Sequence, residues 1–144
     1  MYRELQVHEL KARNAMRVAA VDMKRGTLVT VDGNGKLAKA AGVDGLRIAN
    51  RGLNKDYYKS VAGIVSDYDV VEDTIKAGDF VAEVAMEIGE RYAFEVADAE
   101  AVPAGSHLEA TAGVFTVKSA GTSRYIARGV FNDNGHKLLI VEVL

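Results

Sequence analysis

The chain has 144 residues, which is the usual size of one domain and is long enough to bury a hydrophobic core. It contains no cysteine, and this excludes disulfides, thiolate metal sites and cysteine nucleophiles. Its 18 basic and 20 acidic residues give a net charge of -2, which argues against a dedicated nucleic-acid-binding protein. No apolar run reaches the roughly 18 residues of a membrane span, and the charged N-terminus does not fit a signal peptide. We therefore expect a soluble protein made in the cytoplasm, with no membrane or nucleic-acid partner.

The first 15 residues have a pattern of their own. Apolar residues and one histidine stand among charged residues here, at Tyr2, Leu5, Val7, His8 and Leu10. A short amphipathic helix would place residues three apart, such as Tyr2 and Leu5, on one face. An extended arm and a frayed terminus fit the same pattern. We treat residues 1–15 as an N-terminal arm that precedes a single β-rich domain at 16–144.

The remainder of the chain has the composition of strands separated by turns. Fourteen glycines against one proline favour this organisation over a helical bundle. Residues 27–31 and 36–40 are expected to form a hairpin, because Asp32-Gly33-Asn34-Gly35 between them accepts positive φ angles. An exposed loop is expected at 51–60. Further strands are predicted by β-branched and aromatic residues at 16–21, 46–50, 61–66, 80–86 and 91–96.

A short pattern with glycine before an apolar strand occurs three times. The three glycines are Gly26, Gly78 and Gly105. Glycine lets the chain reverse into a strand at little steric cost. The spacings between the glycines are unequal, so the pattern is not a solenoid repeat. It indicates one type of turn used repeatedly within a single barrel or sandwich.

Residues 102–144 are predicted to form the rigid β body. Alternation assigns apolar residues to one face of each expected strand. The final strand should be central or covered, because an exposed apolar edge strand invites aggregation. The fold class expected is mainly β, a small antiparallel β-barrel or β-sandwich with little helix. In the strands before this region, Phe80, Ala82, Val84 and Met86 share one face, as do Tyr92, Phe94 and Val96. The expected core of the region itself is Phe115, Val117, Tyr125, Ala127, Phe131, Leu139, Val141 and Val143.

The sequence offers little catalytic or metal-binding chemistry. His8, His107 and His136 lie far apart and form no metal-spaced pair. The acidic residues at 67–73 lack the glycine and the bidentate glutamate of a calcium loop, and the loop at 132–135 lacks a carboxylate at its first position. There is no nucleophile elbow and no phosphate-binding loop. We expect no catalytic residues, no metal and no cofactor.

Several turn-and-strand segments resemble one family of viral proteins. They are GTLVTVDGNGK, SDYD, KAGDFVAEV, GERYAFEV and the ending FTVKSAGTSRYIARGVFNDNGHKLLIVEVL. From about Lys24 onward, this order resembles that of the small proteins that decorate or cement the capsids of tailed bacteriophages. The resemblance implies a non-enzymatic virion protein on the exterior of an icosahedral shell, often a homotrimer. Its partners would be the major capsid protein and further copies of itself, with no cofactor and no small-molecule substrate.

This resemblance gives the irregular segments a role as contacts. A terminal arm that pairs with a neighbour's sheet edge would reinforce binding to the shell, and many weak copies would act together. The expected contacts to the capsid or to a neighbouring copy lie in the arm and in the 51–60 loop. They are Tyr2, Leu5, Val7, His8, Leu10, Asn54, Tyr57 and Tyr58.

Two other functions fit the sequence. A tail-tube or head-tail connector component would also be β-rich, but it would assemble with itself into rings. An enzyme or a small-ligand barrel would need carboxylates such as Asp67 or Asp69 for activity.

Overall fold

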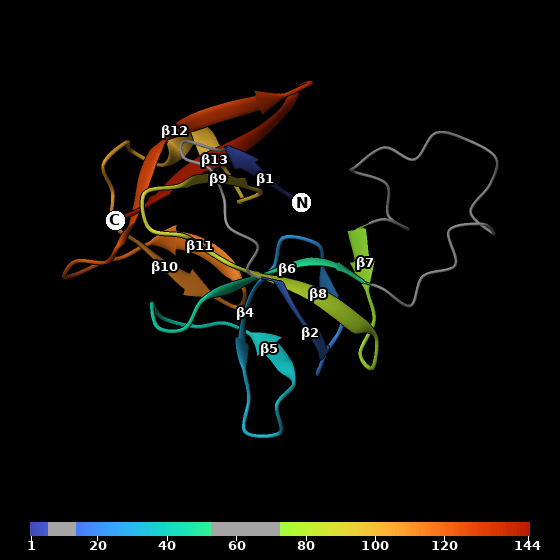
Figure 1. Cartoon of the computed structure of the whole chain (residues 1–144). Helices are drawn as coiled ribbons and strands as arrows, with labels where there is room; N and C mark the ends of the chain where they lie inside the picture. The colour runs from blue at the N-terminus through green and yellow to red at the C-terminus, as the bar shows by residue number, and fades with distance from the viewer. Residues whose placement is uncertain (6–13, 53–72) are drawn as a thin grey trace.

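A computed structural model describes residues 1–5, 14–52 and 73–144 (Figure 1). In these ranges the chain is mainly β, with several antiparallel sheets, and this confirms the expected fold class. The sheets pack as a small sandwich and do not close into a barrel. No helix in these ranges is long and apolar enough to cross a membrane. The elements in chain order are β1 (Tyr2–Leu5), β2 (Asn14–Val18), β3 (Met23–Lys24), β4 (Leu28–Val31), β5 (Leu37–Lys39), β6 (Arg47–Gly52), β7 (Thr74–Ile75), β8 (Phe80–Ala85), β9 (Arg91–Phe94), the 3-10 helix η1 (Ala99–Ala101), β10 (Leu108–Thr111), β11 (Val114–Val117), β12 (Tyr125–Asp133) and β13 (His136–Val143).

Two sheets make up most of the described structure. The four-stranded sheet has the order β1-β9-β13-β12, and the five-stranded sheet has the order β2-β8-β6-β4-β5. Two strand pairs, β10-β11 and β3-β7, accompany them. The final strand β13 lies between β9 and β12, so its expected central position is confirmed.

The hairpins follow from their turn residues. The expected hairpin forms between β4 and β5, where Asp32 Oδ1 accepts the N–H groups of Asn34 and Lys36. The β12–β13 hairpin turns through Asn134 and Gly135, which both have positive φ, at 54° and 95°. Asparagine followed by glycine suits such a two-residue turn because both residues tolerate this backbone region.

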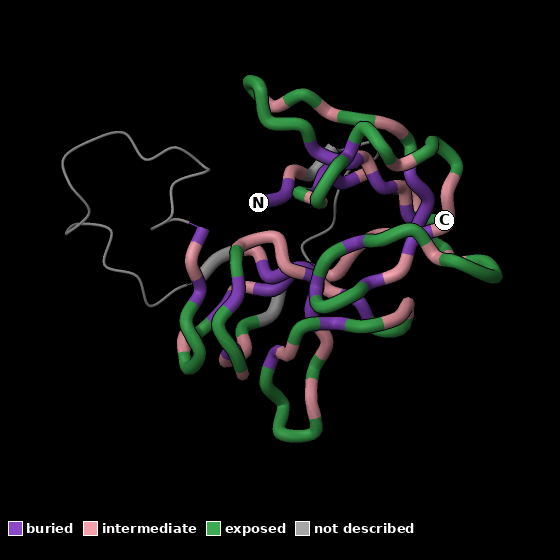
Figure 2. The backbone as a smooth tube through the Cα atoms, turned by 180° about the vertical axis from the view of Figure 1, so that it is seen from behind, coloured by how far each residue is buried: buried purple, intermediate pink, exposed green. Residues whose placement is uncertain are grey.

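The larger core lies where the two sheets and the β10–β11 hairpin face one another. It includes Leu28 and Ile48 from the five-stranded sheet and Leu139 and Val141 from the four-stranded sheet. A row of aromatic rings crosses it, with centroid distances of 6.1 Å for Tyr2–Phe94, 5.0 Å for Phe94–Phe115 and 5.4 Å for Phe115–Tyr125. Exposed residues gather in the turns, as at the tip of the β4–β5 hairpin (Figure 2).

A second core lies on the other face of the five-stranded sheet. Its members include Val29, Ala49 and Val81, which alternate with residues of the larger core along their strands. Ala19, just after β2, forms a bridge with Leu37 of β5. The sheet therefore curls around this second core and has buried residues on both faces.

Most of the expected core is confirmed, with two differences. Phe115, Tyr125, Ala127, Leu139, Val141 and Val143 are buried and Phe131 is partly buried, but Val117 is 46% exposed as the last residue of β11. Phe80, expected on the buried face of β8, is 51% exposed, whereas Val81 beside it is fully buried. Alternation cannot select the buried face here because the two cores cover both faces of β8.

One four-residue turn occurs four times, each time leading into a strand. The turns begin at Lys24, Lys76, Glu87 and Pro103, and the third residue is a glycine with φ of 92°, 91°, 89° and 90° respectively. In each turn the N–H of the fourth residue donates to the carbonyl of the first, at 3.0 to 3.2 Å. Positive φ at the third position is the requirement of a type II turn, and glycine meets it without strain.

Each of these turns is also fixed to a neighbouring segment in the same way. The glycine N–H donates to the carbonyl of one residue there, and the N–H of that same residue donates back to the carbonyl of the fourth residue of the turn. The residues that receive the turns are Ala49, Ala19, Val143 and Ala127. The expectation of a repeated turn at Gly26, Gly78 and Gly105 is confirmed, and Gly89 adds a fourth case.

The N-terminal residues correct the expected domain boundary. β1 pairs with β9 from Tyr2–Phe94 to Leu5–Arg91, so residues 2–5 are part of the four-stranded sheet. Asn14 and Ala15 are in β2 and pair with β8. The expected arm at 1–15 is therefore wrong for its two ends, because both join sheets of their own chain. Residues 6–13 lie outside the described residues.

Candidate functional site

The expected contact residues are distributed unevenly over the structure. Tyr2 is buried in the larger core, where its ring stacks on Phe94 and its hydroxyl donates to Asn50 Oδ1. The expectation that Tyr2 contacts a neighbour is therefore corrected. The backbone of Leu5 pairs with Arg91 within the sheet. The remaining expected contacts, Val7, His8, Leu10, Asn54, Tyr57 and Tyr58, lie outside the described residues, as do Asp67 and Asp69.

The described histidines have ordinary structural positions. His107 Nδ1 lies 3.0 Å from the backbone nitrogen of Ser123, which fixes the entry to β12. His136 is exposed at the start of β13. Within the described ranges, no three histidine or carboxylate side chains gather closely enough to hold a metal ion.

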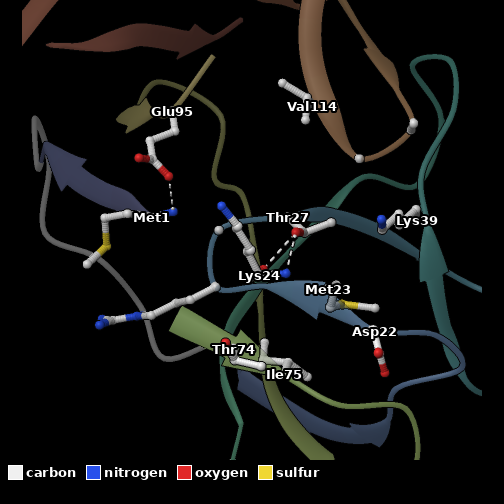
Figure 3. A pocket seen from close by; sticks show the side chains of 14 residues that line it. Met1, Asp22, Met23, Lys24, Thr27, Lys39, Thr74, Ile75, Glu95 and Val114 are labelled. Atoms are coloured by element: carbon white, nitrogen blue, oxygen red, sulfur yellow. Dashed lines mark hydrogen bonds and ion pairs between the residues drawn. The ribbon is translucent and has the colours of Figure 1, made fainter. Parts of the chain in front are cut away.

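A groove lies where the five-stranded sheet, the β3–β7 pair and the β10–β11 hairpin meet. Its first part is a pocket of about 400 Å³ that contains Met23, Thr27, Lys39 and Ile75 (Figure 3). A second pocket of about 360 Å³ extends to residues 136–138 at the start of β13. Lys24, Glu95 and Val114 line both pockets, so the two are adjacent. We call them together the junction groove.

Met1 closes one side of the junction groove. Its ammonium group donates to Glu95 at 2.9 Å and lies 3.7 Å from Asp73, and its carbonyl accepts the N–H of Glu95. Figure 3 shows the ion pair with Glu95 at the groove wall. Gly26 packs directly against the carbonyl group of Met1. The start of β1 is thus held by charge, by a backbone hydrogen bond and by close packing.

Asp73 is the titrating group most affected by this arrangement. Burial raises its pKa above the usual value, and the Met1 ammonium, Lys24 and Arg25 oppose this while Glu95 adds to it. One of its carboxylate oxygens, Oδ1, is buried without a hydrogen-bond partner. Because the residue is only 8% exposed, the charged carboxylate depends on nearby cations rather than on water.

The unpaired cations of the groove are its most distinctive chemical feature. Lys24 and Lys39 are exposed, and neither ammonium group has an ion-pair partner among the described residues. In Figure 3 their side chains lie on either side of Thr27. Both acidic residues of the first pocket are already paired, Asp22 with Lys76 at 3.8 Å and Glu95 with Met1. The groove therefore has a local excess of positive charge in a chain whose net charge is -2.

A buried ion triad lies elsewhere, on three adjacent strands of the five-stranded sheet. Glu83 is fully buried, and its Oε1 accepts hydrogen bonds from Arg17 of β2 and Arg47 of β6, each at 3.1 Å. Its Oε2 has no partner. The two arginines flank Glu83 because β2 and β6 lie on either side of β8 in the sheet.

Neither a protein-family model nor a curated protein sequence matches the chain.

Proposed function

We propose that this chain is a virion structural protein that binds the outer surface of an icosahedral phage shell and stabilises it. One observation carries the proposal. The segments that resemble capsid decoration proteins coincide with the repeated turns, since GTLVTV follows Arg25, KAGDF contains Gly78 and GERYAF begins at Gly89. The resemblance therefore falls on the residues that build the scaffold of both sheets.

The proposed partners are the major capsid protein and further copies of this chain, which assemble as a homotrimer on the virion exterior. The end of β12 offers one surface for such contacts. Ala127 still bonds to Ser106, but after it β12 pairs only with β13 among the described strands. A bulge at Arg128 and Gly129 bends the strand at this point. An open strand edge can pair with a segment of another chain, and many such contacts on one shell reinforce one another.

Co-sedimentation tests the proposal. The purified protein is mixed with preformed, protein-depleted shells of the phage that encodes it, and the pellet is quantified against shell subunits. Saturable binding at a fixed ratio of copies to shell subunits is expected. A pellet without the protein at every concentration would contradict the proposal.

Electron microscopy of the protein alone separates the proposal from its main alternative. A tail-tube or connector component should form rings or tubes without shells, because its partner is itself. The decoration role predicts discrete small particles and no tubes.

A further inference from the structure

We propose that the junction groove binds an extended, acidic peptide segment. The inference rests on the proposed function in one respect, because the segment would then belong to the shell protein. The groove itself is defined by this chain alone, through two adjacent pockets that share Lys24, Glu95 and Val114.

Charge complementarity identifies the ligand as acidic. Six lysines lie in the described ranges, and three of them form ion pairs, namely Lys76, Lys118 and Lys137. Of the other three, Lys24 and Lys39 both line the groove. A carboxylate from outside would find two ammonium groups that form no ion pair with the described residues, whereas an incoming cation would find Asp22 and Glu95 already in ion pairs.

The shape and the apolar surface of the groove favour a peptide over a small anion. Val114 is 40% exposed and stands where the two pockets meet, so it offers an apolar contact in the middle of the groove. An extended segment advances about 3.3 Å per residue and presents alternate side chains to opposite sides. An extended peptide can therefore place carboxylates toward the lysines and an apolar side chain against Val114. A compact anion, in contrast, would fill only one of the two pockets.

Two labelled peptides test the ligand class. One is a fluorescein-labelled decapeptide of alternating glutamate and valine with Gly-Ser ends, and the other has lysine in place of glutamate. Fluorescence anisotropy should show saturable binding of the glutamate peptide that weakens with added salt, and no binding of the lysine peptide. NMR amide shifts should cluster at Gly26, Thr27, Gly113 and Val114. Equal binding of both peptides, no binding, or shifts away from the groove would overturn the inference.

Two charge-reversal variants locate the binding. The groove variant K24E/K39E should bind the glutamate peptide about tenfold more weakly or worse, because two attractions become repulsions. The control variant K36E/R124E makes the same change of charge at exposed residues outside the groove, and it should stay within about twofold of the unchanged protein. If both variants lose the same affinity for the glutamate peptide, the loss comes from the change in net charge alone. That result would contradict binding in the groove.

The same variants on shells distinguish failure of this inference from failure of the proposed function. If the unchanged protein and K24E/K39E sediment equally with shells, the decoration role stands and the groove is not its contact. If the unchanged protein does not bind shells, the proposed function fails, and the peptide measurements alone decide the inference. Loss of shell binding in K24E/K39E but not in K36E/R124E supports both.

Discussion

Gly26 faces the main chain of Met1 so closely that no side chain fits between them. A Cβ at Gly26 would lie 2.7 Å from the carbonyl carbon of Met1 and 2.8 Å from its carbonyl oxygen. The first of the four repeated turns therefore does two things. It leads into β4, and it forms the surface against which the start of β1 packs.

Gly26→Ala should destabilise the protein more than an alanine at Gly78 or Gly105, which occupy the same position in their turns. The substitution forces alanine to φ of 92° and places its Cβ against the Met1 backbone. We expect a loss of about 3 kcal/mol or more in the free energy of unfolding, of which roughly 1–2 kcal/mol is backbone strain alone. Urea denaturation followed by circular dichroism measures it.

Gly78→Ala is the matched control. Gly78 has the same turn and a φ of 91°, but open space surrounds the position of its missing Cβ. Only the strain should remain, at about 1–2 kcal/mol. Equal losses in the two variants would show that the contact with Met1 contributes nothing.

Tyr2→Ala should also destabilise the whole fold. The ring is 5% exposed and stacks on Phe94, so its removal leaves a cavity between the two sheets. Removal of a buried aromatic side chain lowers the free energy of unfolding by about 3–5 kcal/mol. We expect the lower value here, because the structure near the chain end can relax around the cavity. Thermal unfolding measures the change. A melting temperature equal to that of the unchanged protein would restore the view that residues 1–5 are a dispensable arm.

The Glu83 triad predicts an asymmetry between its partners. Glu83 is fully buried, but the side chains of Arg17 and Arg47 are each 34% exposed. In Glu83→Gln the two arginines can turn toward water, and we expect a loss of about 3 kcal/mol or less. In the double variant R17A/R47A the buried carboxylate has no cation, so the loss should be larger, at about 3–5 kcal/mol. Denaturant unfolding compares the two, and the reverse order would refute the explanation.

Asp73 should make stability depend on pH in one direction. Because burial raises its folded pKa above the usual 3.8, the folded state holds the proton more tightly than the unfolded state. This stabilisation is present below pH 3.8 and is lost as the pH rises through the folded pKa. Relative to Asp73→Asn, the unchanged protein should therefore lose stability with rising pH across this window. A stability difference that is constant with pH would show that Asp73 titrates normally.

Glu142 should change the pH dependence of stability in the direction opposite to Asp73, so that its contribution is lost at low pH. Hydrogen bonds from Arg128 and Arg91 hold the pKa of Glu142 below its usual 4.5. The stabilisation is therefore present above pH 4.5 and is lost as the pH falls through the folded pKa. NMR titration of the carboxyl group should show a lowered pKa that rises toward normal in Arg128→Ala. No change in that variant would mean that Arg128 does not stabilise the carboxylate.

Local chemistry made part of the fold predictable from sequence. The β4–β5 hairpin follows from Asp32 to Gly35, and the repeated turn follows from glycine before an apolar strand. Both depend on residues adjacent in the chain. The burial of Phe80 and Val81 could not be assigned, because it depends on two cores that cover opposite faces of one strand.

The junction groove could not be predicted for the same reason. Lys24, Glu95 and Val114 are far apart in sequence and meet only when the sheets pack. The charged, irregular N-terminus indicated an arm. The start of the chain instead lies in the four-stranded sheet, where the aromatic ring of Tyr2 is buried. A ring of that size gains more by burial against Phe94 than by exposure.

We propose above that this protein decorates the outside of a phage shell. Cryo-electron microscopy of shells incubated with the purified protein tests it most directly. We expect added density on the outer surface at symmetry-related positions, into which the four-stranded and five-stranded sheets fit. Bare shells under saturating protein, or rings and tubes of the protein alone, would contradict it.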